Sequence, residues 1–248
     1  MNQVFVVGDV HGCLSMLEKL LDYWHPEKER LIFIGDLIDR GENSLGVVRL
    51  AMKLQNEYDA VIIGGNHEDL FLEWLENPMS HASDYFRMGG TQTVSSFIGE
   101  DRFHSLSYTH LSEQILQSFP EEIEFLKSLP DYMEWKNYLF VHAGVNLDLN
   151  DWKSSGSKYF RSIREPFHQG TNRTGKVIIF GHTPTRRLHA DKRNDVWISP
   201  CKTKIGIDGG AVFGGMLHGI HIRANGECQL YSINSEFEIT CESVPFDV

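Results

Sequence analysis

The sequence predicts an α/β protein built on a parallel sheet, because short apolar runs alternate with helical patterns over its first half. The apolar runs at 4–8, 30–35 and 60–64 are too short for helices. They are also continuous rather than alternating, as in strands covered on both faces. Leucine and valine recur at helical spacing between them. We therefore expect a β-α-β-α-β unit with right-handed crossovers.

Helical spacing of apolar residues predicts five helices, at 12–24, after Gly41, and at 67–76, 84–98 and 111–129. Pro120 is expected to interrupt the last of these or to begin a new helix, because proline cannot occupy a helix interior without breaking a hydrogen bond. Two more buried strands are predicted at 138–141 and 177–180.

The pattern changes after residue 200, where the runs at 204–208, 217–223 and 228–233 alternate more and are separated by glycine-rich turns. Asn225-Gly226 between two such runs predicts a hairpin. We expect these runs to form an antiparallel second part of the same core. Residues 146–175 are polar and lack a sustained period, which predicts a long irregular excursion bordering a site.

Composition narrows the class of protein. The chain has 248 residues, 41% of them hydrophobic and 23% charged, which suits a folded globule. A formal net charge of −11 argues against binding to nucleic acid or to anionic lipid. No apolar run approaches the roughly 18 residues that span a bilayer, and no signal peptide is recognisable. Four cysteines without a C-x-x-C pair read as free thiols, so we expect a cytoplasmic protein.

Potential metal ligands follow the ends of consecutive predicted strands, where ligands collect in parallel sheets. Any one of these residues alone would read as an ordinary turn or capping residue. Together they form a set of carboxylate, amide and imidazole donors without a thiolate, which suits Mn, Fe or Zn. The set is Asp9, His11, Asp36, Asp39, Asn66, His67, Glu68, His142 and His182.

The residues around these ligands form five blocks that resemble those of a known family. The blocks are Gly8-Asp9-Val10-His11-Gly12, Gly35-Asp36-Leu37-Ile38-Asp39-Arg40-Gly41, Gly65-Asn66-His67-Glu68, His142-Ala143-Gly144 and Gly181-His182-Thr183-Pro184. In order and content they resemble the phosphoprotein phosphatase branch of the calcineurin-like metallophosphoesterases. The similarity is to the compact bacterial and phage (lambda phosphatase-like) members, which are related to diadenosine tetraphosphatase. The resemblance implies one domain over 1–248, a four-layer sandwich of two mixed sheets packed face to face with helices outside.

The resemblance also implies two divalent metal ions, with Mn²⁺ as the first expectation and Fe, Zn or Mg as alternatives. Asp9, His11 and Asp36 match the first metal site. Asp36 bridges to the second site, which Asn66, His142 and His182 complete. A hydroxide bound between the two ions would attack phosphorus in line, as dinuclear sites do.

Three further residues in these blocks match catalytic positions of the family. His67 matches the general acid that protonates the leaving group, and Asp39 matches the carboxylate that orients it. Arg40 and Asn66 match positions that bind the substrate phosphate. A second phosphate-binding arginine is expected in the excursion, with Arg161, Arg164 and Arg173 as candidates. We choose Arg164, because Arg164-Glu165 resembles a Trp-x-Arg-Glu segment of the compact members, with Ser162 in the place of the tryptophan.

Two substrates remain open. The first hypothesis is a serine/threonine protein phosphatase that also accepts phosphotyrosine. The alternative is a symmetrical bis(5'-nucleosyl)-tetraphosphatase, which would need a second basic patch for the additional phosphates. Residues 186–193 could supply that patch or form a solvated charged loop, and we favour the loop. A non-catalytic binding module would lack some of the ligands, and all of them are present.

Overall fold

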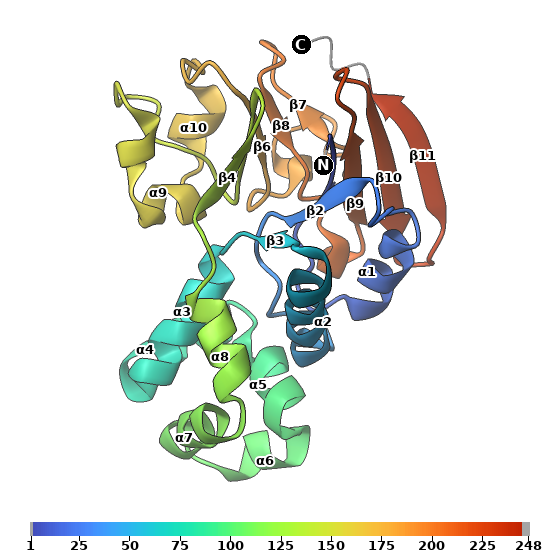
Figure 1. Ribbon diagram of the computed structural model, residues 1–248. Coiled ribbons are helices and arrows are strands. Elements are labelled where there is room, and N and C mark those ends of the chain that lie inside the picture. Colours follow the sequence, from blue (N-terminus) through green and yellow to red (C-terminus); the bar gives the residue numbers. More distant parts are fainter. Residues whose placement is uncertain (1, 245–248) are drawn as a thin grey trace.

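The computed structural model describes residues 2–244, which form two β-sheets and helices that cover their outer faces (Figure 1). One sheet has six strands in the order β11-β10-β9-β1-β2-β3, and the other has five in the order β4-β5-β6-β8-β7. The strands of the first sheet are β1 (Gln3–Val7), β2 (Glu29–Phe33), β3 (Val61–Ile62), β9 (Met216–Ile222), β10 (Cys228–Asn234) and β11 (Ile239–Val244). Those of the second are β4 (Tyr132–Trp135), β5 (Tyr138–Val141), β6 (Val177–Phe180), β7 (Trp197–Ile198) and β8 (Lys204–Gly206).

Three hydrophobic cores define four layers. On β1, Phe5 faces the helices that cover the first sheet, whereas Val4 and Val6 face the second sheet. On β6, Ile179 faces the first sheet and Phe180 packs under helices on the far side. This alternation explains why both strands read as continuous apolar runs, since each is buried on both faces. The predicted four-layer arrangement of helix, sheet, sheet and helix is confirmed.

Most helices belong to the first sheet. Helices α3 to α8 gather in a lobe beside it, and α9 and α10 cover the second sheet (Figure 1). None of the described helices is long and apolar enough to cross a membrane. The helices are α1 (Leu14–Leu21), α2 (Ser44–Tyr58), α3 (Asn66–Glu76), α4 (Pro78–Arg87), α5 (Gly90–Ile98), α6 (Glu100–Ser105), α7 (Tyr108–Ser118), α8 (Pro120–Lys127), α9 (Ser157–Ser162) and α10 (Glu165–Gln169). Short 3₁₀ helices lie at η1 (Trp152–Ser155), η2 (Thr185–Arg187) and η3 (Ala211–Phe213).

Several expectations from the sequence are confirmed. Strands β1, β2 and β3 are parallel, as the β-α-β-α-β pattern predicts. The hairpin at Asn225-Gly226 joins β9 to β10 as antiparallel neighbours. Pro120 begins α8 after α7 has ended, which is the second of the two outcomes expected for it.

Other expectations are wrong. The helix expected over 84–98 is two helices, because Gly89 adopts a left-handed φ of 103° between α4 and α5. The run at 204–208 does not belong to an antiparallel part, since β8 is parallel to β6 and antiparallel only to β7. The excursion at 146–175 is less irregular than expected, because it contains η1, α9 and α10.

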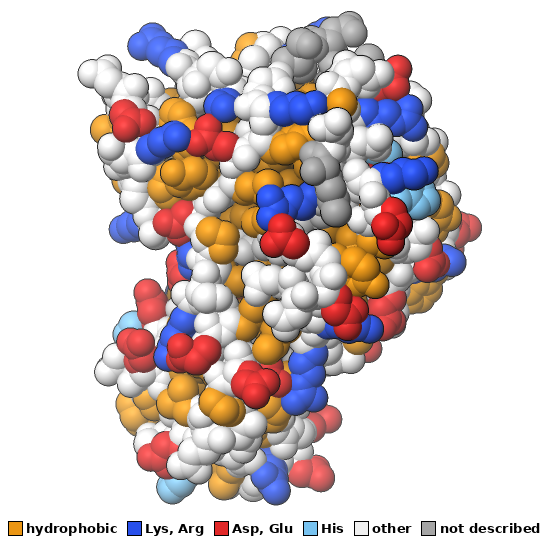
Figure 2. Space-filling view, viewed as in Figure 1, with side chains coloured by type: hydrophobic (Ala, Val, Ile, Leu, Met, Phe, Trp, Pro, Cys, Tyr) orange, Lys and Arg blue, Asp and Glu red, His pale blue; other side chains and the backbone are white. Residues whose placement is uncertain are grey.

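The charge of the surface is unevenly distributed on the face that Figure 2 shows. Acidic side chains spread over the helical lobe, and Lys and Arg side chains are more frequent over the sheets above it. The two signs remain interspersed, so this face carries no broad basic surface of the kind that binds nucleic acid.

Candidate active site and metal centre

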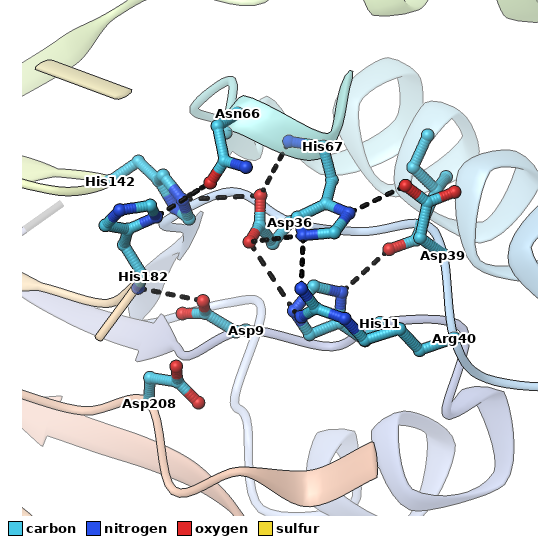
Figure 3. A network of polar contacts seen from close by, with 12 residues as sticks. Asp9, His11, Asp36, Asp39, Arg40, Asn66, His67, His142, His182 and Asp208 are labelled. Carbon is cyan, nitrogen blue, oxygen red and sulfur yellow. Dashed lines mark hydrogen bonds and ion pairs between the residues drawn. The ribbon is translucent and has the colours of Figure 1, made fainter. Parts of the chain in front are cut away.

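Five loops converge at the carboxyl ends of the central strands, three from the first sheet and two from the second (Figure 3). Asp36, which follows β2, lies at the centre of the group. Its Oδ1 is 3.3 Å from Nε2 of His142, and its Oδ2 is 3.5 Å from Nε2 of His11. The packing of the two sheets therefore joins residues that are more than a hundred positions apart in the chain.

Asp36 belongs to two clusters whose ligand atoms lie within 4.8 Å of one another. One consists of His11, Asp36 and His67, and the other of Asp36, His142 and His182. The first cluster thus holds His67, which the resemblance assigns to proton transfer, where Asp9 was expected. Asp9 is buried beside the second cluster, and its Oδ2 accepts a 2.8 Å hydrogen bond from the amide of His182.

Several buried atoms of this centre are arranged as a cation would require. Oδ1 of Asp9 and Nε2 of His182 have no hydrogen-bond partner. His142 donates from Nδ1 to the carbonyl of Ile34. When the ring is neutral, as a metal ligand must be, the lone pair on Nε2 faces the oxygens of Asp36 and Asn66, each 3.3 Å away. Acceptors that face acceptors are stabilised by a shared cation. The residues present therefore fit divalent metal ions.

A guanidinium group already lies against the first cluster. Arg40 contacts Nε2 of His11 at 2.6 Å and Nε2 of His67 at 2.7 Å. Nδ1 of His11 donates to the carbonyl of Ile38. The lone pair of this imidazole is therefore on Nε2, the atom that faces the guanidinium group of Arg40. The imidazoles are thus oriented by their second nitrogens, an arrangement typical of metal-binding histidines.

The pKa values of the centre reflect an excess of buried negative charge. Burial would raise the pKa of Asp36, but the neighbouring histidines, His142 foremost, hold it well below its usual range. Burial would lower the pKa of His142, yet Asp36 beside it raises that pKa to about 9. Burial and the charge of Asp208 raise the pKa of Asp9. Additional positive charge would stabilise this cluster of carboxylates.

His67 and Asp39 form a buried pair at the edge of the centre. Nδ1 of His67 donates to Oδ2 of Asp39 over 2.7 Å. The other carboxylate oxygen of Asp39 accepts from the hydroxyls of Tyr85 at 2.9 Å and Thr93 at 2.7 Å. Both partners come from the helical lobe, on α4 and α5. The helical lobe therefore fixes the orientation of the Asp39 carboxylate. That carboxylate in turn orients the imidazole of His67.

The loops that carry these residues have an unusual backbone. His11, Asp36, Asp39, Arg40 and His182 all have φ between 46° and 72°. This left-handed region costs a residue with a Cβ about 1 kcal/mol or more relative to a right-handed one. Such conformations persist only where the surroundings hold them in place, and they concentrate at functional sites.

Glu68 provides much of that support. Its buried carboxylate accepts hydrogen bonds from the amides of Asp36 at 3.1 Å, Leu37 at 2.8 Å and Gly65 at 2.8 Å. The bond from Gly65 is part of the capping box that begins α3. Glu68 therefore joins the loop after β2 to the loop after β3 by hydrogen bonds.

Lys204 has a corresponding role under α10. Its ammonium group is buried, and it donates to the carbonyls of Phe167 at 2.8 Å, His168 at 2.7 Å and Gly170 at 2.7 Å. These carbonyls lie at the C-terminal end of α10, where a positive charge is favourable. Arg164 is the residue that precedes this helix. Lys204 thereby anchors the segment that presents Arg164.

The structure separates the three candidate arginines. Arg164 donates to Oγ1 of Thr183 at 3.1 Å, beside the ligand loop, and burial together with the charge of Arg187 lowers its pKa. Arg161 is held elsewhere, by Asp131 at 2.8 Å, Asp69 at 2.5 Å and the carbonyl of Leu129 at 2.8 Å. Arg173 lines a separate cavity with Trp152. Of the three, only Arg164 lies at the centre.

Asp208 and Gly89 also belong to the surroundings of the site, and Asp208 was absent from the sequence prediction. Asp208 is buried beside Asp9, and burial together with other groups, the charge of Asp36 among them, raises its pKa to about 6. It follows β8 directly, so the rule that identified Asp9 and Asp36 applies to it equally. Gly89 accepts a 3.0 Å hydrogen bond from the amide of Arg40, and a Cβ there would lie 2.5 Å from Cγ of Arg40. Gly89-Gly90 is thus both a turn and a support for the arginine.

A sandwich of two mixed sheets whose loops gather buried imidazoles and carboxylates at one edge defines a metal-dependent hydrolase. Residues 3–212 match the family described as calcineurin-like phosphoesterase, so the chain belongs to this family and is a metallophosphoesterase. Membership implies divalent metal ions at the centre described above.

The names of similar proteins state different substrates. The serine/threonine-protein phosphatase 1 of Salmonella typhimurium is 30% identical over 228 residues, which cover 87% of this chain and 90% of that protein. The asymmetrical bis(5'-nucleosyl)-tetraphosphatase PrpE of Oceanobacillus iheyensis is 26% identical over 245 residues, covering 87% and 86%. A crystal structure of a cold-active protein tyrosine phosphatase superposes with a TM-score of 0.66 at 16% identity, over 98% of this chain and 78% of that one, and shares the fold.

Proposed function

We propose that this metallophosphoesterase is a protein phosphatase that removes phosphate from serine and threonine side chains, and from tyrosine. The observation that carries the proposal is the placement of Arg40 and Arg164 on opposite sides of the centre, each beside a different histidine cluster. Two guanidinium groups and the metal ions would neutralise one phosphoryl group. The similarity to the Salmonella phosphatase supports the same substrate.

The roles of the residues follow from their contacts. Asp9, His11, Asp36, Asn66, His142 and His182 would hold two divalent ions, Mn²⁺ by preference, which lower the pKa of water and neutralise phosphoryl oxygens when bound. His67 would protonate the leaving oxygen from Nε2, the nitrogen that Arg40 contacts at 2.7 Å, and its Nδ1 bond to Asp39 orients the ring for that role. Arg40, Arg164 and Asn66 orient the phosphate.

A specific observation favours the dinucleoside polyphosphate as a second candidate. The basic residues of the segment 186–193 differ in their partners. Arg193 forms ion pairs with Asp191 at 3.1 Å and Asp195 at 3.3 Å. Arg187 forms none among the described residues. Arg187 is exposed and lies close enough to Arg164 to lower its pKa. A pair of arginines on this side could bind further phosphates of a polyphosphate chain, as the similarity to PrpE suggests.

One comparison tests the proposal. We expect kcat/KM of the Mn²⁺-loaded enzyme to be higher for phosphopeptides than for diadenosine tetraphosphate. Arg187→Ala should change the phosphopeptide value less than twofold, with the neighbouring Arg186→Ala as the matched control. A higher kcat/KM for diadenosine tetraphosphate that falls selectively in Arg187→Ala would replace the proposal with the second candidate.

A further inference from the structure

A cavity of about 460 Å³ opens beside Arg40 and extends away from the metal centre. Its walls come from the loop after β1 with the start of α1, from the loop after β2, from η3, and from the turn between β10 and β11. The residues that line it are Gly12, Cys13, Leu14, Ser15, Met16, Arg40, Gly41, Glu42, Asn43, Ala211, Val212, Gly214, Ser235 and Phe237. The cavity is contiguous with the phosphate-binding side of the centre, because Arg40 belongs to both.

An exposed aromatic ring, that of Phe213, lies beside Arg40. Phe213 does not line the cavity itself, but its neighbours Val212 and Gly214 do. Phe213 is 56% exposed, and the guanidinium carbon of Arg40 lies 5.2 Å from the centre of its ring. The backbone turn that carries Phe213 is well fixed. The turn η3 is bounded by left-handed glycines, Gly210 with φ 69° and Gly214 with φ 76°, and Gly210 donates to Asp208 at 2.9 Å.

A single exposed apolar side chain needs no explanation by itself. What distinguishes Phe213 is that its ring lies against the guanidinium group of Arg40, which is assigned to phosphate. Hydrogen bonds within the turn hold the backbone on both sides of Phe213. Phe213 therefore offers an aromatic face directly next to the group that binds phosphate.

The charges of the cavity decide which kind of leaving group suits it. Among the described residues that line it, Arg40 is the only cation, and Glu42 adds a negative charge. A leaving group with further phosphates would enter without a countercharge beyond Arg40. An uncharged planar ring, attached to the phosphate through one oxygen, would lie next to both Phe213 and the proton donor His67, which contacts Arg40 at 2.7 Å.

We propose that Phe213 and this cavity form a subsite for the ring of a phosphotyrosine side chain, with the adjoining peptide in the outer part of the cavity. The inference rests on the proposed protein phosphatase function and narrows its substrate. Stacking between two aromatic rings favours phosphotyrosine over phosphoserine, which presents no ring to Phe213.

The test measures a ratio, so that a general loss of activity does not count. Wild type, Phe213→Ala and Phe213→Trp are assayed with Mn²⁺ on two peptides that differ only in phosphotyrosine or phosphoserine. We expect the ratio of the two kcat/KM values to fall about tenfold in Phe213→Ala and to persist in Phe213→Trp. Tyr58→Ala, which removes an exposed ring at the end of α2, is the control and should keep the wild-type ratio.

A binding measurement accompanies the kinetics. Phenylphosphonate should inhibit wild type more strongly than methylphosphonate does, and Phe213→Ala should lose that difference. An unchanged peptide ratio together with unchanged inhibition constants would overturn the subsite. So would a Phe213→Ala enzyme that loses activity only towards diadenosine tetraphosphate, because the ring would then serve a nucleobase. If wild type cleaves p-nitrophenyl phosphate but neither peptide, the protein phosphatase function fails, while the phosphonates still decide the subsite.

Discussion

Glu68 and Lys204 hold the two sides of the centre with the same number of hydrogen bonds and opposite chemistry. Glu68 accepts from three backbone amides in the loops of the six-stranded sheet. Lys204 donates to three backbone carbonyls under the segment that carries Arg164. The first side carries the proposed proton donor and the residue shared by both metal-binding clusters. The second side carries one proposed phosphate contact, Arg164, besides the histidines that are proposed to bind metal. Each side is therefore held by one buried charged group that binds three backbone groups, although the two sides carry unequal shares of the proposed chemistry.

The largest loss of activity is expected from substitution of the proposed proton donor, His67, on the first side. His67→Ala should lower kcat by about 10²–10⁴-fold, because the leaving group then departs without a proton. The metal content, measured by elemental analysis, should stay at the wild-type value. A variant that loses metal would show instead that His67 is a ligand, as its place in the first cluster allows.

The support of the first side comes next. Glu68→Gln keeps the shape but places an amide group among three N–H donors, so it should lower the free energy of unfolding by about 3 kcal/mol. Affinity for Mn²⁺ should fall about 10–100-fold, because Asp36 loses the bond that holds its loop. Urea unfolding and metal titration measure the two effects. Unchanged metal affinity would mean that the loop is held without Glu68.

The phosphate contact of the second side should have a smaller effect. Arg164→Ala should raise KM for a phosphopeptide about tenfold, the value of one charge-assisted hydrogen bond, with little change in metal content. Arg161→Ala is the contrasting variant, since it breaks ion pairs with Asp69 and Asp131 and should lower stability rather than substrate affinity. The reverse result would assign the phosphate to Arg161.

The smallest effect on activity is expected at Lys204. Lys204→Met leaves three buried carbonyls without a donor and should lower stability by about 2 kcal/mol. It should raise KM only a few-fold, because Arg164 is also held by Thr183. A loss of metal as large as in Glu68→Gln would abolish the distinction between the two sides.

The sequence predicted which polar side chains converge at the centre (Figure 3), because donors that follow buried strands are recognisable in the chain itself. The same rule extends to Asp208, where it was not applied. It could not reveal Lys204, since a lysine at the start of a strand reads as a surface residue until α10 folds over it. Strands β4, β7 and β11 were also absent from the prediction. Their residues are largely half-buried or exposed, so they lack the continuous apolar run of a central strand.

The left-handed backbone of the site has a consequence for how this sequence could change over generations. At Asp36 and His182, glycine would adopt the observed φ without steric cost, so substitution there relaxes the chain while deleting a donor. Selection in the laboratory for expression or heat resistance alone would accumulate glycine at such positions. Selection for catalytic turnover would instead retain Asp36 and His182 in spite of their conformational cost. These two positions therefore separate the requirements of catalysis from those of folding stability.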